Sequence, residues 1–205
     1  EVFRHVADDR CMTVPPEALL RPEALAAQAA AIRLDRAAAP CAGPPAAGGT
    51  VYLTAADASG RMVSFIQSNY LGFGSGVVVP GTGIALQNRG LGFVLDEGHP
   101  NRVAGGKRPF HTIIPGFVTR GGRPLMSFGV MGAHMQPQGH VQMITRICDY
   151  GQNPQAACDA PRWHVAPDGS VQLEAGFAQA VVEGLRQRGH AAATGAPDSL
   201  FGGGQ

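Results

Sequence analysis

The sequence lacks features that would assign it to several broad classes of protein. Its 16 basic and 15 acidic residues nearly balance and form no basic stripe, which argues against nucleic acid as a partner. No apolar run approaches the roughly 20 residues that a bilayer span requires, so we expect a soluble protein without a membrane span. These absences argue against a nucleic-acid partner and a membrane span, but they do not indicate an activity.

Ligand sets for metals and phosphates are also missing. The histidines, His99, His134, His140 and His164 among them, are scattered, and no two lie at i, i+4 on one helix with a carboxylate, as helical zinc sites require. Residues 74–76 and 81–83 lack the lysine and the helix of a phosphate-binding loop, so we interpret them as turns. The cysteines lack C-x-x-C spacing, and a chain of this length folds without disulfides. We expect no cofactor, no metal and four free thiols, Cys11, Cys41, Cys148 and Cys158.

Two strand-like segments, 51–56 and 62–68, predict a β-hairpin. Val63, Phe65 and Ser68 indicate two buried faces rather than a clean alternation of buried and exposed residues. The hairpin therefore belongs to a packed layer of the protein.

Residues 112–119 and 124–130 predict a second hairpin, in which Pro115 shifts the first strand toward an edge or a bulge. Strands followed by helices indicate an α+β fold. The other expected elements are helices over 22–35, 138–150, 154–160 and 177–188, short strands over 77–79, 84–87 and 171–174, and a loop over 96–107.

Thr50 stands at the sharpest change of composition in the chain. The small-residue run 37–49 cannot bury enough apolar surface to pack, whereas the strand 51–56 begins at once. Two readings are open: an ordinary loop end, or a site where the chain is cut. A cut would give Thr50 both a hydroxyl nucleophile and an α-amine, whose ordinary pKa of about 7.7 to 8.0 suits a general base.

A series of short motifs follows Thr50 in a fixed order. They are Thr50 to Asp57, Gly60, Phe73 to Gly76, Gly81 to Gly83, Gln87-Asn88, Gly106 to Pro109 and Gly129 to Gly132. This order resembles the small subunit of the γ-glutamyltransferases, and the resemblance runs from about Val2 to Gln205. In that family a precursor cleaves itself before a threonine, which becomes the nucleophile. The resemblance therefore implies cleavage between Gly49 and Thr50, with the α-amine of Thr50 as base.

The resemblance also implies the four-layer αββα sandwich of the N-terminal-nucleophile hydrolases. Residues 1–49 then correspond to the end of a large subunit and its linker, and residues 50–205 to a small subunit truncated at its C-terminus. The chain begins at Glu1 without an initiator methionine. We therefore expect a fragment whose partner is the remaining large-subunit portion of the same precursor.

The segment 129–134 predicts a strand-to-helix turn, where backbone amides are well placed to stabilise an oxyanion. The resemblance assigns this role to the amides of Gly132 and Ala133. The family usually has two glycines here, so Ala133 fits only if its backbone angles suit a residue with a Cβ. The alternative is a glycine required only by a tight turn.

Substrate-binding positions depart from the family pattern. A serine pair after the Lys-Arg-Pro segment is replaced by His111-Thr112, and the carboxylate expected after Gln87-Asn88 is absent from residues 89–92. His111 is equally explained as a core histidine. The resemblance predicts a binding set of Asn69, Asn88, Arg89, His111 and Thr112.

These departures are similar to a bacterial subgroup related to cephalosporin acylases. The resemblance implies an amidohydrolase or acyltransferase that forms an acyl-enzyme on γ-glutamyl or related amides such as glutathione, and the altered binding set favours other amides. The alternatives are an uncleaved pseudoenzyme or binding protein of the same fold and an inactive fragment. Either the cytoplasm or the periplasm fits this reading.

Overall fold

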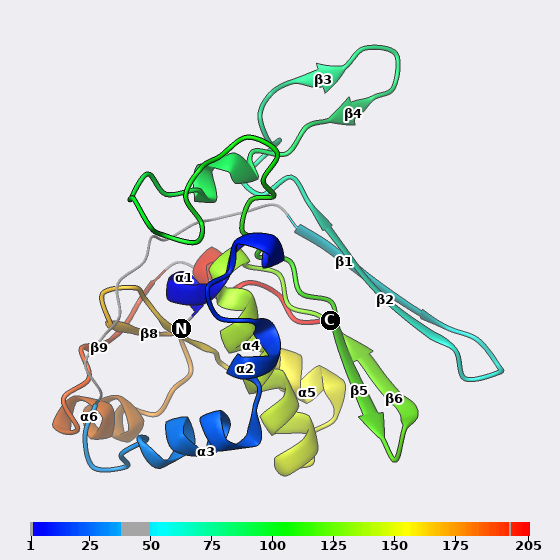
Figure 1. Cartoon of the computed structure of the whole chain (residues 1–205). Helices are drawn as coiled ribbons and strands as arrows, with labels where there is room; N and C mark the ends of the chain where they lie inside the picture. The colour runs from blue at the N-terminus through cyan, green and yellow to red at the C-terminus, as the bar shows by residue number, and fades with distance from the viewer. Residues whose placement is uncertain (1, 38–49, 197) are drawn as a thin grey trace.

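Helices and short sheets are mixed along the chain in the computed structural model, which describes residues 2–37, 50–196 and 198–205 (Figure 1). The helices are α1 (Val2–His5), α2 (Pro16–Leu19), α3 (Pro22–Ala30), α4 (Gln136–Ile144), α5 (Pro154–Asp159) and α6 (Gln179–Gln187). The strands are β1 (Thr50–Ala56), β2 (Met62–Ser68), β3 (Val78–Val79), β4 (Ile84–Ala85), β5 (Gly116–Arg120), β6 (Arg123–Phe128), β7 (Trp163–Val165), β8 (Val171–Leu173) and β9 (Ala192–Thr194). The mixture confirms the predicted α+β class. Residues 38–49 of the predicted spacer, Gly49 among them, lie outside the described residues.

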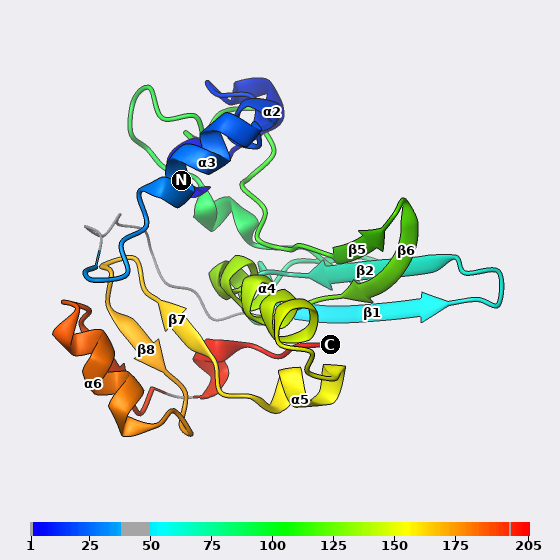
Figure 2. The same cartoon turned by 90° about the horizontal axis from the view of Figure 1, so that it is seen from below.

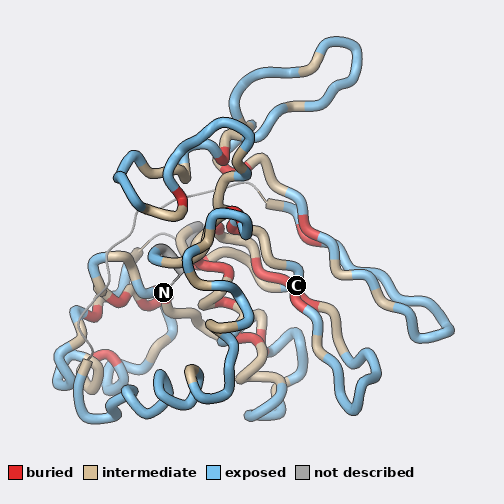
Figure 3. The backbone as a smooth tube through the Cα atoms, viewed as in Figure 1, coloured by how far each residue is buried: buried red, intermediate tan, exposed pale blue. Residues whose placement is uncertain are grey.

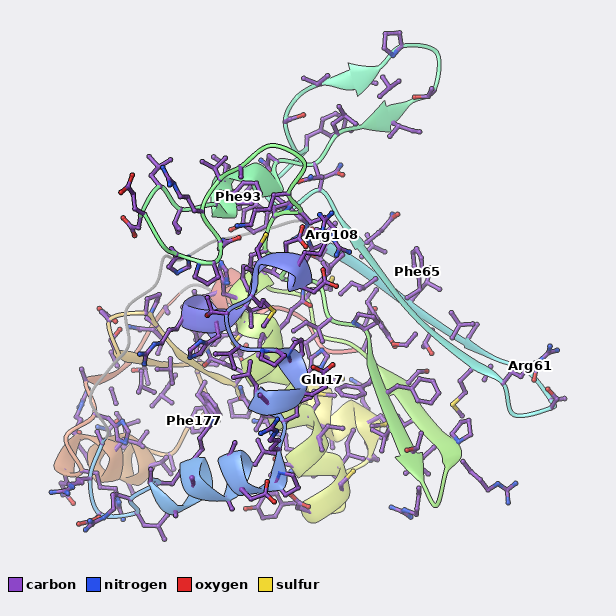
Figure 4. All side chains as sticks on the ribbon, in the orientation of Figure 1. Glu17, Arg61, Phe65, Phe93, Arg108 and Phe177 are labelled. Carbon is purple, nitrogen blue, oxygen red and sulfur yellow. The ribbon has the colours of Figure 1, made fainter. Side chains whose placement is uncertain are left out.

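Strands β1 and β2 form the long hairpin that extends from the body in Figure 1, in register from Thr50 opposite Ser68 to Ala56 opposite Met62. One face is buried at Tyr52 and Ile66, and most of the rest of the hairpin is exposed (Figure 3). The expectation of two buried faces is wrong for this chain, because no described element covers the outer face. That face carries four exposed apolar side chains, Val51, Leu53, Val63 and Phe65, and Figure 4 shows Phe65 on the outer side.

The second hairpin, β5 and β6, packs against the first. Strand β5 begins only after Pro115, which has no N–H to donate to a ladder, so the predicted strand over 112–119 is shortened at its start. The Ser64 hydroxyl of β2 donates to the Gly116 carbonyl at 2.8 Å. A Cβ on Gly129 would lie 2.4 Å from the Tyr52 ring, so glycine is needed where the turn after β6 meets β1.

Helix α4 lies beside the two hairpins in Figure 2 and begins two residues earlier than predicted. Residues 145–149 continue it as one π-helical turn, and Gly151 follows with φ +66°, as the predicted end at a glycine requires. The core between helix and hairpin is a cluster of four buried residues, Phe128, Val130, Met143 and Ala157.

A separate small sheet follows, in the order β7-β8-β9. Strands β8 and β9 are parallel and are connected through α6, which packs with them around a second buried cluster. Of the three strands, only β8 was expected from the sequence. The cluster consists of Val171, Leu173, Val182 and Ala192.

Several smaller expectations can be compared with the structure. Helix α3 ends at Ala30, so the expected helix over 22–35 is too long. Three of the four cysteines are described, and all three are free thiols; Cys41 lies outside the described residues. Within the described residues no helix has the length and hydropathy to cross a bilayer, and no three potential metal ligands cluster.

Candidate active site

Thr50 is the first residue of β1, and its partner across the hairpin is Ser68. Its Oγ1 donates a hydrogen bond to Ser68 Oγ at 3.1 Å, and the side chain is half-buried. The Tyr70 N–H also donates to Ser68 Oγ, at 2.9 Å. Ser68 therefore holds the Thr50 hydroxyl in one direction. Thr50 is also the first residue after the predicted cleavage site.

Thr54 lies four residues further along the same strand, about 13 Å away at the usual strand rise. Its hydroxyl makes a short contact with the Ser127 hydroxyl of β6. This contact helps to fasten the two hairpins together. Thr54 is therefore a structural residue at the wrong distance to replace Thr50.

The predicted oxyanion turn has backbone angles that few residues adopt. Gly132 has φ +129°, and Ala133, which is 3% exposed, has φ +51°. Ala133 thus occupies the left-handed region, at a cost that a second glycine would avoid. Neither amide N–H donates to a backbone carbonyl of the described residues. The preceding residue is fixed, because the Met131 N–H donates to the Gly203 carbonyl at 2.8 Å.

Arg89 is almost fully buried beside Ser68, with 2% of its surface exposed. Its Nη1 donates to Thr112 Oγ1 at 2.9 Å, and its Nη2 reaches the Ser68 carbonyl at 3.4 Å. The guanidinium also lies over the Tyr70 ring, 5.4 Å from its centroid. Burial lowers the pKa of Arg89 and raises the pKa of Tyr70, since both charged forms are desolvated.

The side chain of Asn88 binds the backbone of the loop that follows β2. Its Oδ1 accepts from the Leu71 N–H at 3.0 Å, and its Nδ2 donates to the carbonyls of Leu71 and Gly74. Its backbone N–H donates to the Asn69 carbonyl at 3.1 Å. Asn88 therefore joins two chain segments and fixes the starting point of the turn that carries Arg89.

His111 does not share a site with Thr112. Thr112 is 5% exposed and faces Arg89, whereas His111 is exposed and its Nδ1 lies 2.9 Å from the Pro109 carbonyl. His111 instead lines an open cavity of about 340 Å³ with Asp8 and Arg108. The two residues that replace the family's serine pair therefore lie on different sides of their segment.

Asp8 holds the Lys-Arg-Pro segment to the N-terminal part of the chain. Its buried carboxylate lies 2.7 Å from Arg10 Nη2 and accepts from the Arg108 N–H at 2.8 Å. The Arg10 guanidinium and the Arg108 amide hold the pKa of Asp8 well below its usual range. Arg108 thus binds Asp8, and Figure 4 shows Arg108 next to the N-terminal segment.

Hydrogen bonds connect four residues: Thr50 to the Ser68 hydroxyl, and Arg89 to the Ser68 main-chain carbonyl and to the Thr112 hydroxyl. The sequence reading missed Ser68 as a site residue. The signal that identifies it is the hairpin register, because a turn at 57–60 places Thr50 opposite Ser68.

A model of the γ-glutamyltranspeptidase family matches residues 3–205 of this sequence. The chain belongs to this family. The resemblance seen in the sequence is therefore correct, including its acylase-like character, as individual relatives show.

Two curated bacterial proteins are 41% identical to the chain. The oxamate amidohydrolase proenzyme of Klebsiella pneumoniae aligns over 191 residues, 91% of this chain and 36% of that protein. The glutathione hydrolase-like YwrD proenzyme of Bacillus subtilis aligns over 158 residues, 75% of this chain and 30% of that protein. The crystal structure of cephalosporin acylase from Bacillus halodurans superimposes with a TM-score of 0.88 at 48% identity, covering 98% of this chain and 37% of the acylase. The chain spans about a third of the length of these relatives.

Proposed function

We propose that the complete protein is a self-processing amidohydrolase or acyltransferase in which Thr50 becomes an N-terminal nucleophile. The observation that carries this proposal is the hydrogen bond of Thr50 Oγ1 to Ser68 at the start of β1. Family membership and two relatives named as proenzymes support it. In this proposal residues 1–49 end the large subunit, and residues 50–205 belong to the small subunit.

Processing begins with attack of the Thr50 hydroxyl oxygen on the Gly49 carbonyl carbon. The carbon–nitrogen bond breaks, the Thr50 nitrogen takes up the proton that the hydroxyl loses and becomes an amine, and an ester forms between Gly49 and Thr50 Oγ1. Water then hydrolyses this ester, which leaves a Gly49 carboxylate and a free α-amine on Thr50. The same residue now carries nucleophile and base.

In turnover the free amine takes the proton of the Thr50 hydroxyl as its oxygen attacks the amide carbonyl of the substrate. The N–H groups of Gly132 and Ala133 stabilise the oxyanion of the tetrahedral intermediate. The leaving amine departs with the proton from the Thr50 amine, and an acyl ester remains. Water releases the acid, or an acceptor amine takes the acyl group.

The outer face of β1 and β2 supports the proposed four-layer αββα sandwich. Its exposed apolar residues include Val51, Leu53 and Phe65, and an exposed apolar sheet face is rarely left uncovered in a soluble protein. We assign its cover to the large-subunit portion of the same precursor. The relatives are about three times as long as this chain, which leaves sufficient length for such a layer.

The acyl donor is an amide, with γ-glutamyl compounds such as glutathione as the family's reference substrates. We propose poor activity on them, because residues 89–92 hold no carboxylate for the glutamyl amino group. Losing such a charged hydrogen bond costs about ten- to a hundredfold in specificity. A relative named for oxamate favours a small acyl group of another kind.

The proposal is tested by expressing the full-length gene and determining the N-terminal sequence of each resulting chain. One chain should begin Thr-Val-Tyr. Steady-state assays on that protein with γ-glutamyl-p-nitroanilide and with glutaryl-p-nitroanilide should favour the latter. An intact precursor in folded protein, inert toward both, would identify a pseudoenzyme instead.

A further inference from the structure

Arg89 is a buried cation without an anionic partner among the described residues. The side chain is 2% exposed, and it contacts the Thr112 hydroxyl, the Ser68 carbonyl and the Tyr70 ring, all formally neutral. No Asp or Glu of the described chain forms an ion pair with it. Burying an unpaired charge is costly, so such a group usually has a counterion.

The guanidinium is held in place by neutral groups and keeps donors for a ligand. Thr112 and Ser68 engage Nη1 and Nη2 with one contact each, out of the five N–H groups that arginine offers. A planar guanidinium matches a carboxylate through two parallel hydrogen bonds. Arg89 therefore has the chemistry of a carboxylate receptor that is already oriented.

Arg89 and the nucleophile contact the same residue. Thr50 Oγ1 donates to the Ser68 hydroxyl at 3.1 Å, and Arg89 Nη2 reaches the Ser68 carbonyl at 3.4 Å. These contacts and the span of one residue place the guanidinium within about 10 Å of the Thr50 hydroxyl. A short acyl chain spans that distance.

We propose that Arg89 binds a carboxylate on the acyl part of the substrate, so that the enzyme selects half-amides of short dicarboxylic acids. This inference rests on the proposed function, because it needs Thr50 to attack the amide carbonyl. Thr112 positions the guanidinium, and Tyr70 covers its face. The substrate anion thus becomes the counterion that the described chain lacks.

The test compares two substrates that differ in one carboxylate, glutaryl-p-nitroanilide and valeryl-p-nitroanilide, on the processed full-length enzyme. The wild type should prefer the glutaryl compound by at least tenfold in kcat/KM. Arg89→Met should lose about ten- to a hundredfold on the glutaryl compound and little on the valeryl compound. Arg120→Met, an exposed arginine at the tip of the second hairpin, is the matched control and should leave the ratio unchanged.

Two further variants keep the test decisive if Arg89→Met fails to fold. Arg89→Lys keeps the charge without the bidentate geometry, and Thr112→Val removes the hydroxyl that holds Nη1. Both should reduce the glutaryl preference, and both should raise the inhibition constant of free glutarate, which reports binding without turnover. A processed, active enzyme whose preference and glutarate inhibition do not depend on Arg89 overturns this inference alone. Failure to release an N-terminal Thr50 or to turn over any amide overturns the proposed function as well.

Discussion

Ser68 fixes the direction of the Thr50 hydroxyl from directly across the hairpin. Its Oγ accepts from Thr50 Oγ1 at 3.1 Å and from the Tyr70 N–H at 2.9 Å, so the acceptor is itself held by the backbone. Tyr70 has φ +76°, which few residues with a side chain adopt. The chain therefore accepts local strain just after β2, where the Ser68 hydroxyl is positioned.

Replacing Ser68 by Ala should slow processing of the full-length precursor by about fivefold, since a neutral hydrogen bond contributes about 1 kcal/mol. Ser68→Thr should retain most of the rate. The rate is measured as the appearance of the chain that begins at Thr50. Ser59→Ala, in the exposed turn of the same hairpin, is the control. Equal rates for Ser68→Ala and the control would show that Thr50 needs no positioning from Ser68.

Thr50→Ala should abolish both processing and turnover, whereas Thr50→Ser should keep part of each because a hydroxyl and an α-amine survive. Thr54→Ala should process normally and lose at most about 1 kcal/mol of stability with its contact to Ser127. Mass spectrometry of the chains and assays of the products separate the two threonines. Activity retained by Thr50→Ala but lost by Thr54→Ala would reverse the assignment.

In the oxyanion turn, replacing Gly132 should destabilise the protein, whereas replacing Ala133 by glycine should not. A Cβ on Gly132 would meet Met135 Cβ at 3.0 Å with φ at +129°, so Gly132→Ala should destabilise the protein by about 1 to 3 kcal/mol and impair turnover. Ala133→Gly relieves a left-handed alanine and should change stability by less than about 1 kcal/mol. Thermal melts and kcat of the processed protein test the pair. A Gly132→Ala enzyme with normal kcat would remove these amides from the proposed mechanism.

At the scale of elements, the sequence predicts what local pattern determines. Both hairpins and the helices α4, α5 and α6 were expected close to where they lie, because the periods of these elements, and the glycines after α4 and α6, are local signals. The sequence predicted neither β7 nor β9, and tertiary pairing with β8 defines both strands. Exposure of Val63 and Phe65 depends on which element covers the outer face of the hairpin, and no local pattern records that.

The candidate site was likewise predictable only where local sequence motifs mark its residues. Thr50, Gly132 and Ala133 came from the order of motifs, and the side-chain group around Thr50 came only with three-dimensional pairing. Thr112 and Arg89 are 23 residues apart in sequence, and their hydrogen bond follows from how two loops fold together. That Thr112 faces Arg89 while His111 lines a different, open cavity is likewise visible only in the structure.

At the scale of the whole molecule, the buried His164 and the half-buried His134 and His140 are in surroundings that disfavour a charge. Burial lowers the pKa of His134, His140 and His164, and the neighbouring His164 lowers that of His134 further. Two of these rings have a buried nitrogen without a partner among the described residues, Nε2 of His140 and Nδ1 of His164. All three therefore favour the neutral form in the folded state.

The free energy of unfolding should consequently fall as the pH drops from 7 toward 5. A histidine in the unfolded chain has a pKa near 6.5, and the pKa of His164 in the folded protein is lower. Below pH 6.5 the unfolded chain therefore binds more protons than the folded protein. The histidine contribution is thus fully present above about pH 6.5 and is lost as the pH falls through the lowered folded pKa values. Urea unfolding of the processed protein between pH 5 and 8 measures it, and His164→Gln should reduce the slope. An unchanged slope in that variant would mean that His164 is protonated as readily in the folded protein as in the unfolded chain.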